Sequence, residues 1–229
     1  MKIKGLQKTT LLDFPEKLAC TVFTGGCNFR CPFCHNASLV LSPNSIEEIS
    51  EEAFFEYLSK RQKMLDGVCI TGGEPLLNSD ITDFIKRIRS LGLLVKLDTN
   101  GSFPERLEAL LDEGLLDYAA MDIKSSINKY SVASGTDKFI FEIEQSIDII
   151  MKKAPDYEFR TTVVRELHTK EDIVNIAKRI QNAKKYFLQS YIDSGDTIVK
   201  GFSAYSPSEM LNILESAQAI LPSSALRGI

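Results

Sequence analysis

Three cysteines lie close together in the sequence, at Cys27, Cys31 and Cys34. Their thiolates are soft ligands, which favour iron or zinc over magnesium or calcium. A structural zinc ion takes four protein ligands, and His35 is a poor fourth because adjacent residues rarely fit one tetrahedral ion; a zinc ion with three ligands and a water stays open. Three thiolates can also hold three irons of a four-iron cluster and leave one iron free. The spacing therefore predicts a metal centre, and an iron–sulfur cluster accounts for it most simply.

The other two cysteines, Cys20 and Cys69, lie inside apolar stretches of strand length. A thiol in such surroundings usually behaves as a small buried hydrophobic residue. We therefore expect both to belong to the core and neither to bind the metal.

Further polar residues recur where apolar stretches end. The stretch Gly72-Gly73-Glu74-Pro75 follows one of them, and glycines there would let the backbone approach a ligand closely. Because the carboxyl ends of parallel strands meet at one edge of a sheet, we expect these residues to lie beside the cysteines. The set comprises Gly72, Gly73, Glu74, Asp98, Thr99, Asn100, Asp122, Lys124 and Arg160.

Strand-like and helix-like stretches alternate along the chain, which is typical of a parallel sheet with helical crossovers. The first helix shows Ser45 three residues before Glu48, a capping-box pattern. The predicted strands cover 18–23, 67–72, 93–99, 117–124, 157–164 and 185–191. The predicted helices cover 45–64, 79–92, 104–114, 139–153, 170–183 and 207–220.

These elements predict a single α/β domain over 1–229, with an N-terminal arm over 1–17 and six β-α units over 18–221. Periodicity alone leaves two arrangements open, a doubly wound sheet and an incomplete barrel. In both of them the ligand site lies at the carboxyl ends of the strands.

Composition excludes several classes of protein. The net charge is −4 and no long basic run occurs, which argues against nucleic-acid binding. Apolar stretches are too short for a membrane span, and the start MKIKGLQKTT lacks the apolar core of a secretory signal. We expect a cytoplasmic protein, in whose reducing surroundings clustered thiols bind metal or do chemistry rather than form disulfides.

The cysteine motif resembles that of the radical S-adenosylmethionine superfamily, with Phe33 just before the last cysteine and the stretch "ITGGEPLL" at 70–77. The stretches "LDTNG" (97–101) and "MDIK" (121–124) are similar to the branch that activates glycyl-radical enzymes. Long stretches of the chain look like anaerobic ribonucleoside-triphosphate reductase activating proteins. Of the two folds left open, we predict the partial (β/α)6 TIM-like barrel, a parallel sheet with outer helices.

The resemblance implies a [4Fe–4S] cluster on Cys27, Cys31 and Cys34, with S-adenosylmethionine chelated on the open iron. It places a monovalent cation near Asp98, Thr99 and Asp122, beside the carboxylate of the cofactor, and pairs Lys124 with that carboxylate. The residues implied in cofactor binding are Phe33, Gly72, Gly73, Glu74, Asp98, Thr99, Asn100, Asp122, Lys124 and Arg160.

The chemistry implied by the resemblance is reductive cleavage of S-adenosylmethionine to a 5′-deoxyadenosyl radical, which generates a glycyl radical on anaerobic ribonucleotide reductase. No second cysteine cluster is present, so the electron would come from a donor such as flavodoxin or ferredoxin. Alternatives are a pyruvate formate-lyase-type activating enzyme, a radical enzyme acting on a small molecule, and a non-catalytic metal-binding module. Tyr191 stands where the formate-lyase branch carries a histidine, which favours the reductase.

Three further features lie outside these motifs. His168 is expected to be a solvated loop residue, and 128–139 reads as a polar loop at the active rim. Glu16 stands where relatives commonly have glycine, so the turn there is expected to differ.

Overall fold

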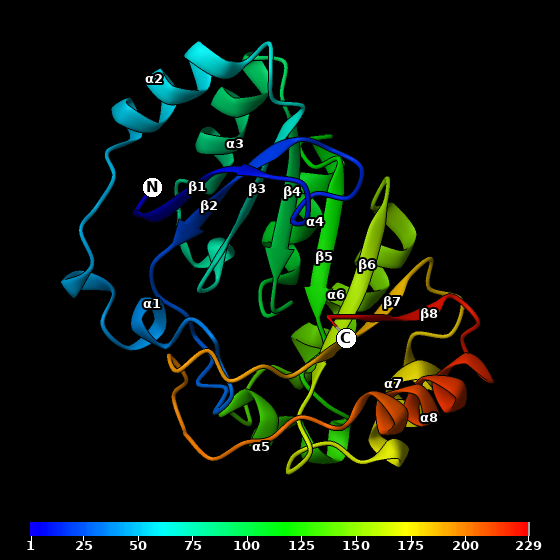
Figure 1. The fold of residues 1–229 in the computed structure, drawn as a ribbon. Coiled ribbons are helices and arrows are strands. Elements are labelled where there is room, and N and C mark those ends of the chain that lie inside the picture. The colour runs from blue at the N-terminus through cyan, green and yellow to red at the C-terminus, as the bar shows by residue number, and fades with distance from the viewer. Residues whose placement is uncertain (229) are drawn as a thin grey trace.

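The computed structural model describes residues 1–228 and shows one eight-stranded sheet in which each strand lies next to its neighbours in the sequence. The sheet is parallel except for the first pair, β1 and β2, which is antiparallel. Figure 1 shows the strands fanning out in order, with helices along their outer side. The strands are β1 (Ile3–Thr10), β2 (Ala19–Thr24), β3 (Gly67–Gly72), β4 (Leu94–Thr99), β5 (Tyr118–Asp122), β6 (Tyr157–Val163), β7 (Tyr186–Ser190) and β8 (Ser224–Arg227).

The predicted α/β partial barrel is confirmed, and the six predicted strands correspond to β2–β7. The two outer strands were not predicted. β1 lies in the segment expected to be an arm and pairs with β2, whereas β8 follows the last helix and pairs with β7. Both depend on pairing with a strand already in the sheet, a contact that local periodicity does not encode.

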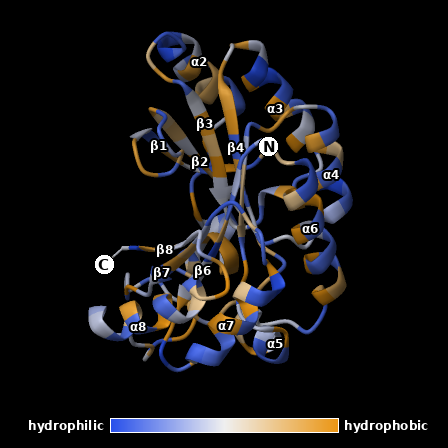
Figure 2. Cartoon of the chain, turned by 90° about the vertical axis from the view of Figure 1, so that its right-hand side faces the viewer, coloured by the Kyte–Doolittle hydropathy of each residue, from blue (hydrophilic) through white to orange (hydrophobic). Residues whose placement is uncertain are grey.

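Eight α-helices and three short 3-10 helices lie within the described residues. The core lies between the sheet and the inner faces of the longer helices, where residues such as Ile85, Ile147 and Ile176 are fully buried. Figure 2 shows this amphipathic pattern, with hydrophobic colour along the central strands and hydrophilic colour on the outer helix faces. The helices are α1 (Ala37–Leu41), α2 (Glu51–Arg61), α3 (Ile81–Ser90), α4 (Pro104–Asp112), α5 (Tyr130–Ser134), α6 (Ile140–Lys153), α7 (Lys170–Arg179) and α8 (Pro207–Gln218), with 3-10 turns η1 (Pro43–Ser45), η2 (Pro75–Leu77) and η3 (Ile127–Lys129).

The first long helix begins later than predicted. Ser45 ends the 3-10 turn η1, and α2 is capped by Ser50, whose side chain accepts a hydrogen bond from the amide of Ala53. The intervening chain is extended because Ile49 forms a bridge with Ile3 of β1. The predicted capping box at Ser45 is therefore wrong, because tertiary pairing with β1 holds this segment out of the helix.

The segment 128–139, predicted to be a polar loop, is helical over η3 and α5. Glu16 adopts a positive φ of 60°, a left-handed conformation that favours glycine and explains why glycine suits this turn. Among residues 1–228, no helix has both the length and the apolar character needed to cross a membrane.

Candidate functional site

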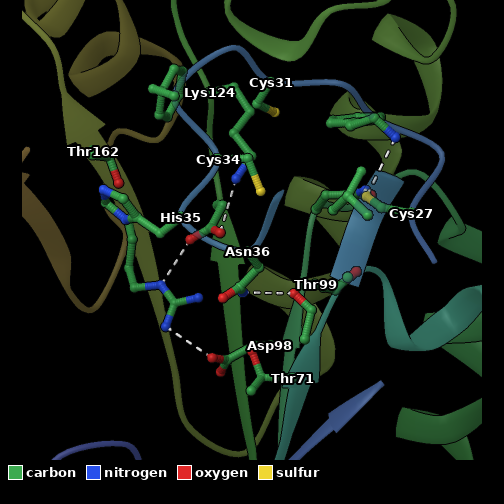
Figure 3. Close-up of a pocket in the computed structure, with 18 of the residues that line it drawn as sticks. Cys27, Cys31, Cys34, His35, Asn36, Thr71, Asp98, Thr99, Lys124 and Thr162 are labelled. Atoms are coloured by element: carbon green, nitrogen blue, oxygen red, sulfur yellow. Dashed lines mark hydrogen bonds and ion pairs between the residues drawn. The ribbon is translucent and has the colours of Figure 1, made fainter. Parts of the chain in front are cut away.

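The cysteine loop follows β2 and carries its three thiols to the carboxyl end of the sheet (Figure 3). The amide of Cys34 donates to the carbonyl of Cys31 at 3.0 Å, and the amide of Phe29 lies 3.4 Å from the sulfur of Cys27. The chain thus folds back on itself between the cysteines. As a result, all three thiols line one cavity of about 400 Å³.

Two glycines explain how β3 packs against this loop. The amide of Gly73 donates to the carbonyl of Thr24 at 2.9 Å, and the next amide donates to the carbonyl of Gly26. A Cβ at Gly73 would lie 1.8 Å from that Gly26 oxygen, and Gly72 has a φ of 118° and a similar lack of space. The two glycines are therefore required for close contact between the end of β3 and the cysteine loop.

The short helix α5 supports the other side of the loop. The amide of Arg30 donates to the carbonyl of Ser134 at 2.9 Å, and the Cys31 thiol lies 3.6 Å from the same oxygen. Gly135 ends α5 with a φ of 70°, and a Cβ there would lie 2.2 Å from the Arg30 carbonyl. The segment that the sequence left without a role thus holds the cysteine loop in place.

The segment between β7 and α8, residues 191–206, also crosses the cysteine loop (Figure 1). The amide of Val199 donates to the carbonyl of Pro32 at 2.8 Å, and the hydroxyl of Ser38 donates to Asp196 at 2.6 Å. At its start, the ring of Tyr191 stacks on exposed His35 with centroids 5.5 Å apart. This segment therefore packs against the cysteine loop from outside the cavity lining.

Burial dominates the electrostatics of the thiols. It raises the pKa of Cys31 to about 12 and, together with the nearby charge of Glu74, the pKa of Cys27 to about 11. Without a metal, both groups are neutral at physiological pH. A bound metal cation would supply the positive charge needed to deprotonate them.

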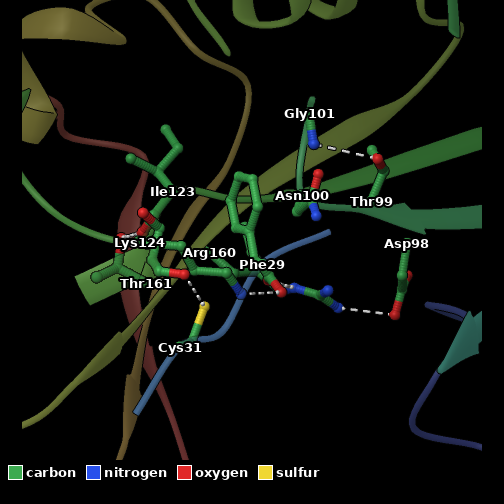
Figure 4. Close-up of polar contacts among 12 residues, drawn as sticks. Phe29, Cys31, Asp98, Thr99, Asn100, Gly101, Ile123, Lys124, Arg160 and Thr161 are labelled. Carbon is green, nitrogen blue, oxygen red and sulfur yellow. Dashed lines mark hydrogen bonds and ion pairs between the residues drawn. The ribbon is translucent and has the colours of Figure 1, made fainter. Parts of the chain in front are cut away.

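Charged side chains from three neighbouring strands form the opposite wall. Arg160 on β6 donates from Nε to Asp122 on β5 at 2.8 Å. It also donates from Nη1 to Asp98 on β4 at 3.2 Å (Figure 4). Lys124 Nζ lies 3.0 Å from the second oxygen of Asp122, and Lys96 contacts the second oxygen of Asp98. Charges therefore alternate in sign along this set, which we call the ionic ladder: Lys96, Asp98, Arg160, Asp122 and Lys124. All of its members except the buried Lys96 line the cavity.

The ionic ladder shifts the pKa values of its members in favour of their charged forms. Burial alone would raise the pKa of Asp98 and Asp122, but Arg160 and the adjacent lysines lower both below the usual range. Burial would likewise lower the pKa of Lys124, but Asp122 raises it instead. The ladder is therefore fully ionised at neutral pH.

Glu74 is fully buried and does not line the cavity. One carboxylate oxygen accepts from the amide of Leu76 at 3.0 Å and from the hydroxyl of Thr99 at 2.9 Å. The other oxygen accepts from the amide of Asn100 at 2.7 Å. Glu74 thus ties the end of β3 to the end of β4, and it reaches the cavity only through these partners.

Asn100 connects this junction to the cysteine loop. Its side-chain amide donates to Asn28 at 3.0 Å and lies 3.7 Å from the Cys27 sulfur, while its carbonyl oxygen accepts from the amide of Ser102 at 2.9 Å. Because each polar atom of the Asn100 side chain is engaged, its orientation toward the thiols is fixed.

His168 is buried, so the expectation of a solvated loop residue is wrong. Its Nδ1 accepts from the amide of Val164 at 3.0 Å, which leaves the proton on Nε2 to donate to the carbonyl of Lys124 at 2.7 Å. Its ring also meets the edge of Phe33, with centroids 6.0 Å apart. His168 therefore links the cysteine loop to the last residue of the ionic ladder.

The structure brings the predicted residues together at one rim. Every predicted cofactor or metal residue except Glu74 lines the cavity. Cys20 and Cys69 are fully buried, as expected. The lining also includes residues that sequence reasoning missed, namely Asp13, Thr71, Thr162 and Gln189. Thr162 was detectable, because it lies two residues beyond Arg160 and alternate strand residues share a face.

The donor set suits an iron–sulfur cluster with one open iron. Three thiols line the cavity, and no fourth cysteine does so. Among the described residues, no three histidine, cysteine, aspartate or glutamate side chains are placed to hold a single metal ion. In a four-iron cluster each thiolate binds a different iron, so the thiols need to share a cavity rather than converge on one point.

Comparison with known proteins identifies the family. The model of the radical SAM superfamily matches residues 21–180. A protein of Methanocaldococcus jannaschii with the provisional name glycyl-radical enzyme activating enzyme is 32% identical over 82% of this chain and 79% of its own. A second protein of that organism with the same provisional name is 29% identical over 71% of this chain and 62% of its own.

Among solved structures, a domain of pyruvate-formate lyase-activating enzyme from Bacteroides vulgatus superimposes with a TM-score of 0.58. At 17% identity, this match covers 71% of the present chain and 99% of the other, and it supports the fold alone. The family match covers both the cysteine loop and the ionic ladder. The chain therefore belongs to the radical SAM superfamily, whose enzymes use a [4Fe–4S] cluster and S-adenosylmethionine.

Proposed function

We propose that this protein activates a glycyl-radical enzyme, with anaerobic ribonucleotide reductase as its partner. Cys27, Cys31 and Cys34 would hold the cluster, and the strand ends opposite them would hold S-adenosylmethionine. When bound, the cluster supplies one electron that cleaves the cofactor into methionine and a 5′-deoxyadenosyl radical, which removes a hydrogen atom from a glycine of the partner.

The observation that carries this proposal is the single cavity shared by the thiols and the ionic ladder. S-adenosylmethionine presents a carboxylate, an ammonium and an adenine. Lys124, at the open end of the ladder, would attract the carboxylate. Phe33 is buried beside the cysteines and would pack against the cluster or the adenine. This chain therefore binds and orients the cofactor between two fixed walls.

Two observations favour a protein substrate over a small molecule. Both relatives named as glycyl-radical enzyme activating enzymes match over most of this chain. In addition, the segment 191–206 contacts the cysteine loop, and a partner that inserts its glycine into the cavity could contact this segment. The reductase is preferred to a formate lyase because Tyr191 stacks on His35 where that other branch carries a histidine.

The test is anaerobic reconstitution with iron and sulfide, reduction, and incubation with S-adenosylmethionine and a candidate partner. We expect 5′-deoxyadenosine by chromatography and a glycyl-radical signal by electron paramagnetic resonance on the reductase. A reductase in which the receiving glycine is replaced by alanine is the matched control and should give no signal. A signal on a formate lyase alone would overturn the choice of partner, and no 5′-deoxyadenosine from protein with a complete cluster would overturn the activity itself.

In the cell, the reducing electron would come from a separate protein, because the chain carries no second cysteine cluster. A flavodoxin or ferredoxin is the expected class of donor. Replacing the chemical reductant in the same assay with reduced flavodoxin or ferredoxin should sustain 5′-deoxyadenosine formation. Failure with both would exclude these donors without affecting the other assignments.

A further inference from the structure

The resemblance to glycyl-radical activating enzymes implies a monovalent cation near Asp98, Thr99 and Asp122. Such an ion would offset the two carboxylates and would need free oxygen atoms as ligands. The site would therefore have to offer oxygen atoms without a cation beside them and a negative charge that no side chain offsets.

The oxygens that would bind the ion are already engaged. Asp98 has Lys96 on one oxygen and Arg160 on the other. Asp122 has Arg160 on one oxygen at 2.8 Å and Lys124 on the other at 3.0 Å. The hydroxyl of Thr99 donates to Glu74 and accepts from the amide of Gly101 at 3.1 Å. Each of the four carboxylate oxygens therefore already faces a side-chain cation, and a further monovalent ion placed among them would be repelled.

The charges also leave no deficit for an ion to fill. The three cations of the ionic ladder face its two carboxylates, and Arg160 also lies 3.8 Å from Glu158, which is paired with Arg227. Counted with that second pair, four cations face three carboxylates, so the set keeps one net positive charge. The carboxylate of S-adenosylmethionine carries one negative charge, and its binding would neutralise the set. A bound potassium or sodium ion would instead leave an excess of positive charge.

Lys96 is the member of the ladder that makes this possible. It lies on β4 two residues before Asp98, so both side chains project from the same face of the strand. Its side chain is 1% exposed and its ammonium forms an ion pair with Asp98. The ammonium also lies 3.7 Å from the Cys69 sulfur and 5.8 Å from the centre of the Tyr118 ring, and the charges of Arg160 and Glu158 act on it at longer range. A buried ammonium without a carboxylate partner would be costly, so Lys96 is committed to Asp98.

We propose that Lys96 is a built-in cation, which together with Arg160 takes the place of a monovalent ion beside the cofactor carboxylate. Lys96 is a positioning residue, because it acts on the cofactor through Asp98. This inference rests on the cofactor site of the proposed function and is independent of the partner protein. Its consequence is that S-adenosylmethionine binds equally well with and without small monovalent cations.

The experiment measures the dissociation constant of S-adenosylmethionine by equilibrium dialysis on the cluster-loaded protein. The buffers contain potassium, sodium or only tetramethylammonium, which is too large for the site. The wild type should give the same dissociation constant in all three. In Lys96→Met the site loses its ammonium, so we expect binding weaker by about tenfold in tetramethylammonium, as a loss of about 1.4 kcal/mol produces, with recovery in potassium or sodium.

Lys86→Met is the matched control, because Lys86 forms an exposed ion pair with Glu113 and should bind as the wild type does in every buffer. A wild type that loses affinity in tetramethylammonium would overturn the inference, and so would a Lys96→Met variant whose loss no ion relieves. If that variant does not fold, the three measurements on the wild type still show whether cofactor binding depends on a small monovalent cation. Absence of cofactor binding by the wild type in every buffer would also overturn the proposed function, whereas cation-dependent binding would overturn this inference alone.

Discussion

The two walls of the cavity are held in opposite ways. On the thiol side, Cys31 is buried, Cys27 is half-buried, both are neutral without a metal, and the loop is fixed mainly by backbone hydrogen bonds. On the strand side, Asp98 and Asp122 are ionised and each is matched by side-chain cations. Neutral thiols tolerate an apolar site without partners, whereas buried carboxylates do not.

This difference separates what the fold requires from what the chemistry requires. The ionic ladder is complete in the folded chain, so loss of a member should appear first in stability. The thiol side is completed by a bound metal, so loss of a thiol should appear in metal binding and leave the fold intact. Substitutions on each side, with matched controls, can sharpen or break this contrast.

The largest effect is expected from Cys31→Ala. Without this ligand the four-iron cluster should not form, and 5′-deoxyadenosine should fall to the level of protein without iron. The unfolding transition of the metal-free variant in urea should stay within about 1 kcal/mol of the wild type, since the substitution removes one sulfur from a small side chain. Iron content, chromatography of the product and urea unfolding are the measurements.

Cys20→Ala is the control for this substitution, because Cys20 is equally buried but lies in β2 outside the cavity. It should retain both iron and product. The distinction between the walls would fail if Cys31→Ala kept its cluster, or if it unfolded the metal-free protein.

The next largest effect is expected from Arg160→Met on the strand side. Removing the guanidinium leaves Asp98 and Asp122 facing each other with one cation fewer between them, and breaking a buried ion pair in this way costs about 3–5 kcal/mol. Urea unfolding of the metal-free protein measures this loss. Arg165→Met is the control, because Arg165 pairs with Glu209 on the surface, where such pairs contribute about 1 kcal/mol or less. Equal losses in the two variants would contradict the ladder's role in stability.

A smaller effect is expected from Glu74→Gln at the junction of the two walls. The carboxylate accepts three hydrogen bonds, and a glutamine would turn its amide group toward one of the donors. Leaving a buried donor without an acceptor costs about 1–3 kcal/mol, which urea unfolding at about pH 8 would measure. Glu166→Gln is the control, since Glu166 accepts bonds from Ser203 at an exposed position and should change stability by about 0.5 kcal/mol or less.

The same substitution tests the ionisation of Glu74. Burial raises the pKa of Glu74 from 4.5 to about 7, although three hydrogen bonds oppose the rise. Within this pH window the folded carboxyl keeps a proton that the unfolded chain has released, so this group's contribution to stability falls as the pH rises. The wild type should therefore lose stability relative to Glu74→Gln between about pH 5 and pH 7. Parallel stability curves for the two proteins would contradict the raised pKa.

The sequence predicted the rim of the cavity better than its interior. Residues at strand ends, such as Asp98 and Asp122, could be found because an apolar run stops abruptly at a polar group. Lys96 was passed over because a lysine within a strand looks like a residue on a solvated face, although its spacing from Asp98 places both on one face. Glu74 was expected to contact the ligand, and its position outside the lining depends on where β4 ends, which no local pattern gives.

Features that depend on long-range contacts were missed for the same physical reason. Asp13 reaches the cavity because it lies in the connection between the paired strands β1 and β2, where its carboxylate accepts a hydrogen bond from the hydroxyl of Thr21 at 2.5 Å. The polar segment before α6 supports the cysteine loop through contacts of Ser134 and Gly135 with Arg30 and Cys31, about 100 residues earlier in the chain. In each case the short sequence of the segment fits more than one role, and the residue whose contact fixes that role lies elsewhere in the chain.

The smallest effect is expected from His168→Gln, which tests the link between the walls. A glutamine can replace at most part of the two hydrogen bonds to Val164 and Lys124, so we expect a loss of about 1 kcal/mol in urea at about pH 8. His35 is the only other histidine and is exposed, so His35→Gln is the control and should cost less stability.

The same substitution tests the protonation of His168. Burial lowers the pKa of His168 from 6.5, so the unfolded chain takes up a proton as the pH falls while the folded ring stays neutral. Stability contributed by this group is therefore lost below about pH 6.5, and His168→Gln should lack that loss. If the variant loses unfolding free energy as steeply as the wild type at acid pH, the His168 ring is protonated in the folded protein. The contact that joins Phe33 to Lys124 would then involve a charged ring rather than a neutral one.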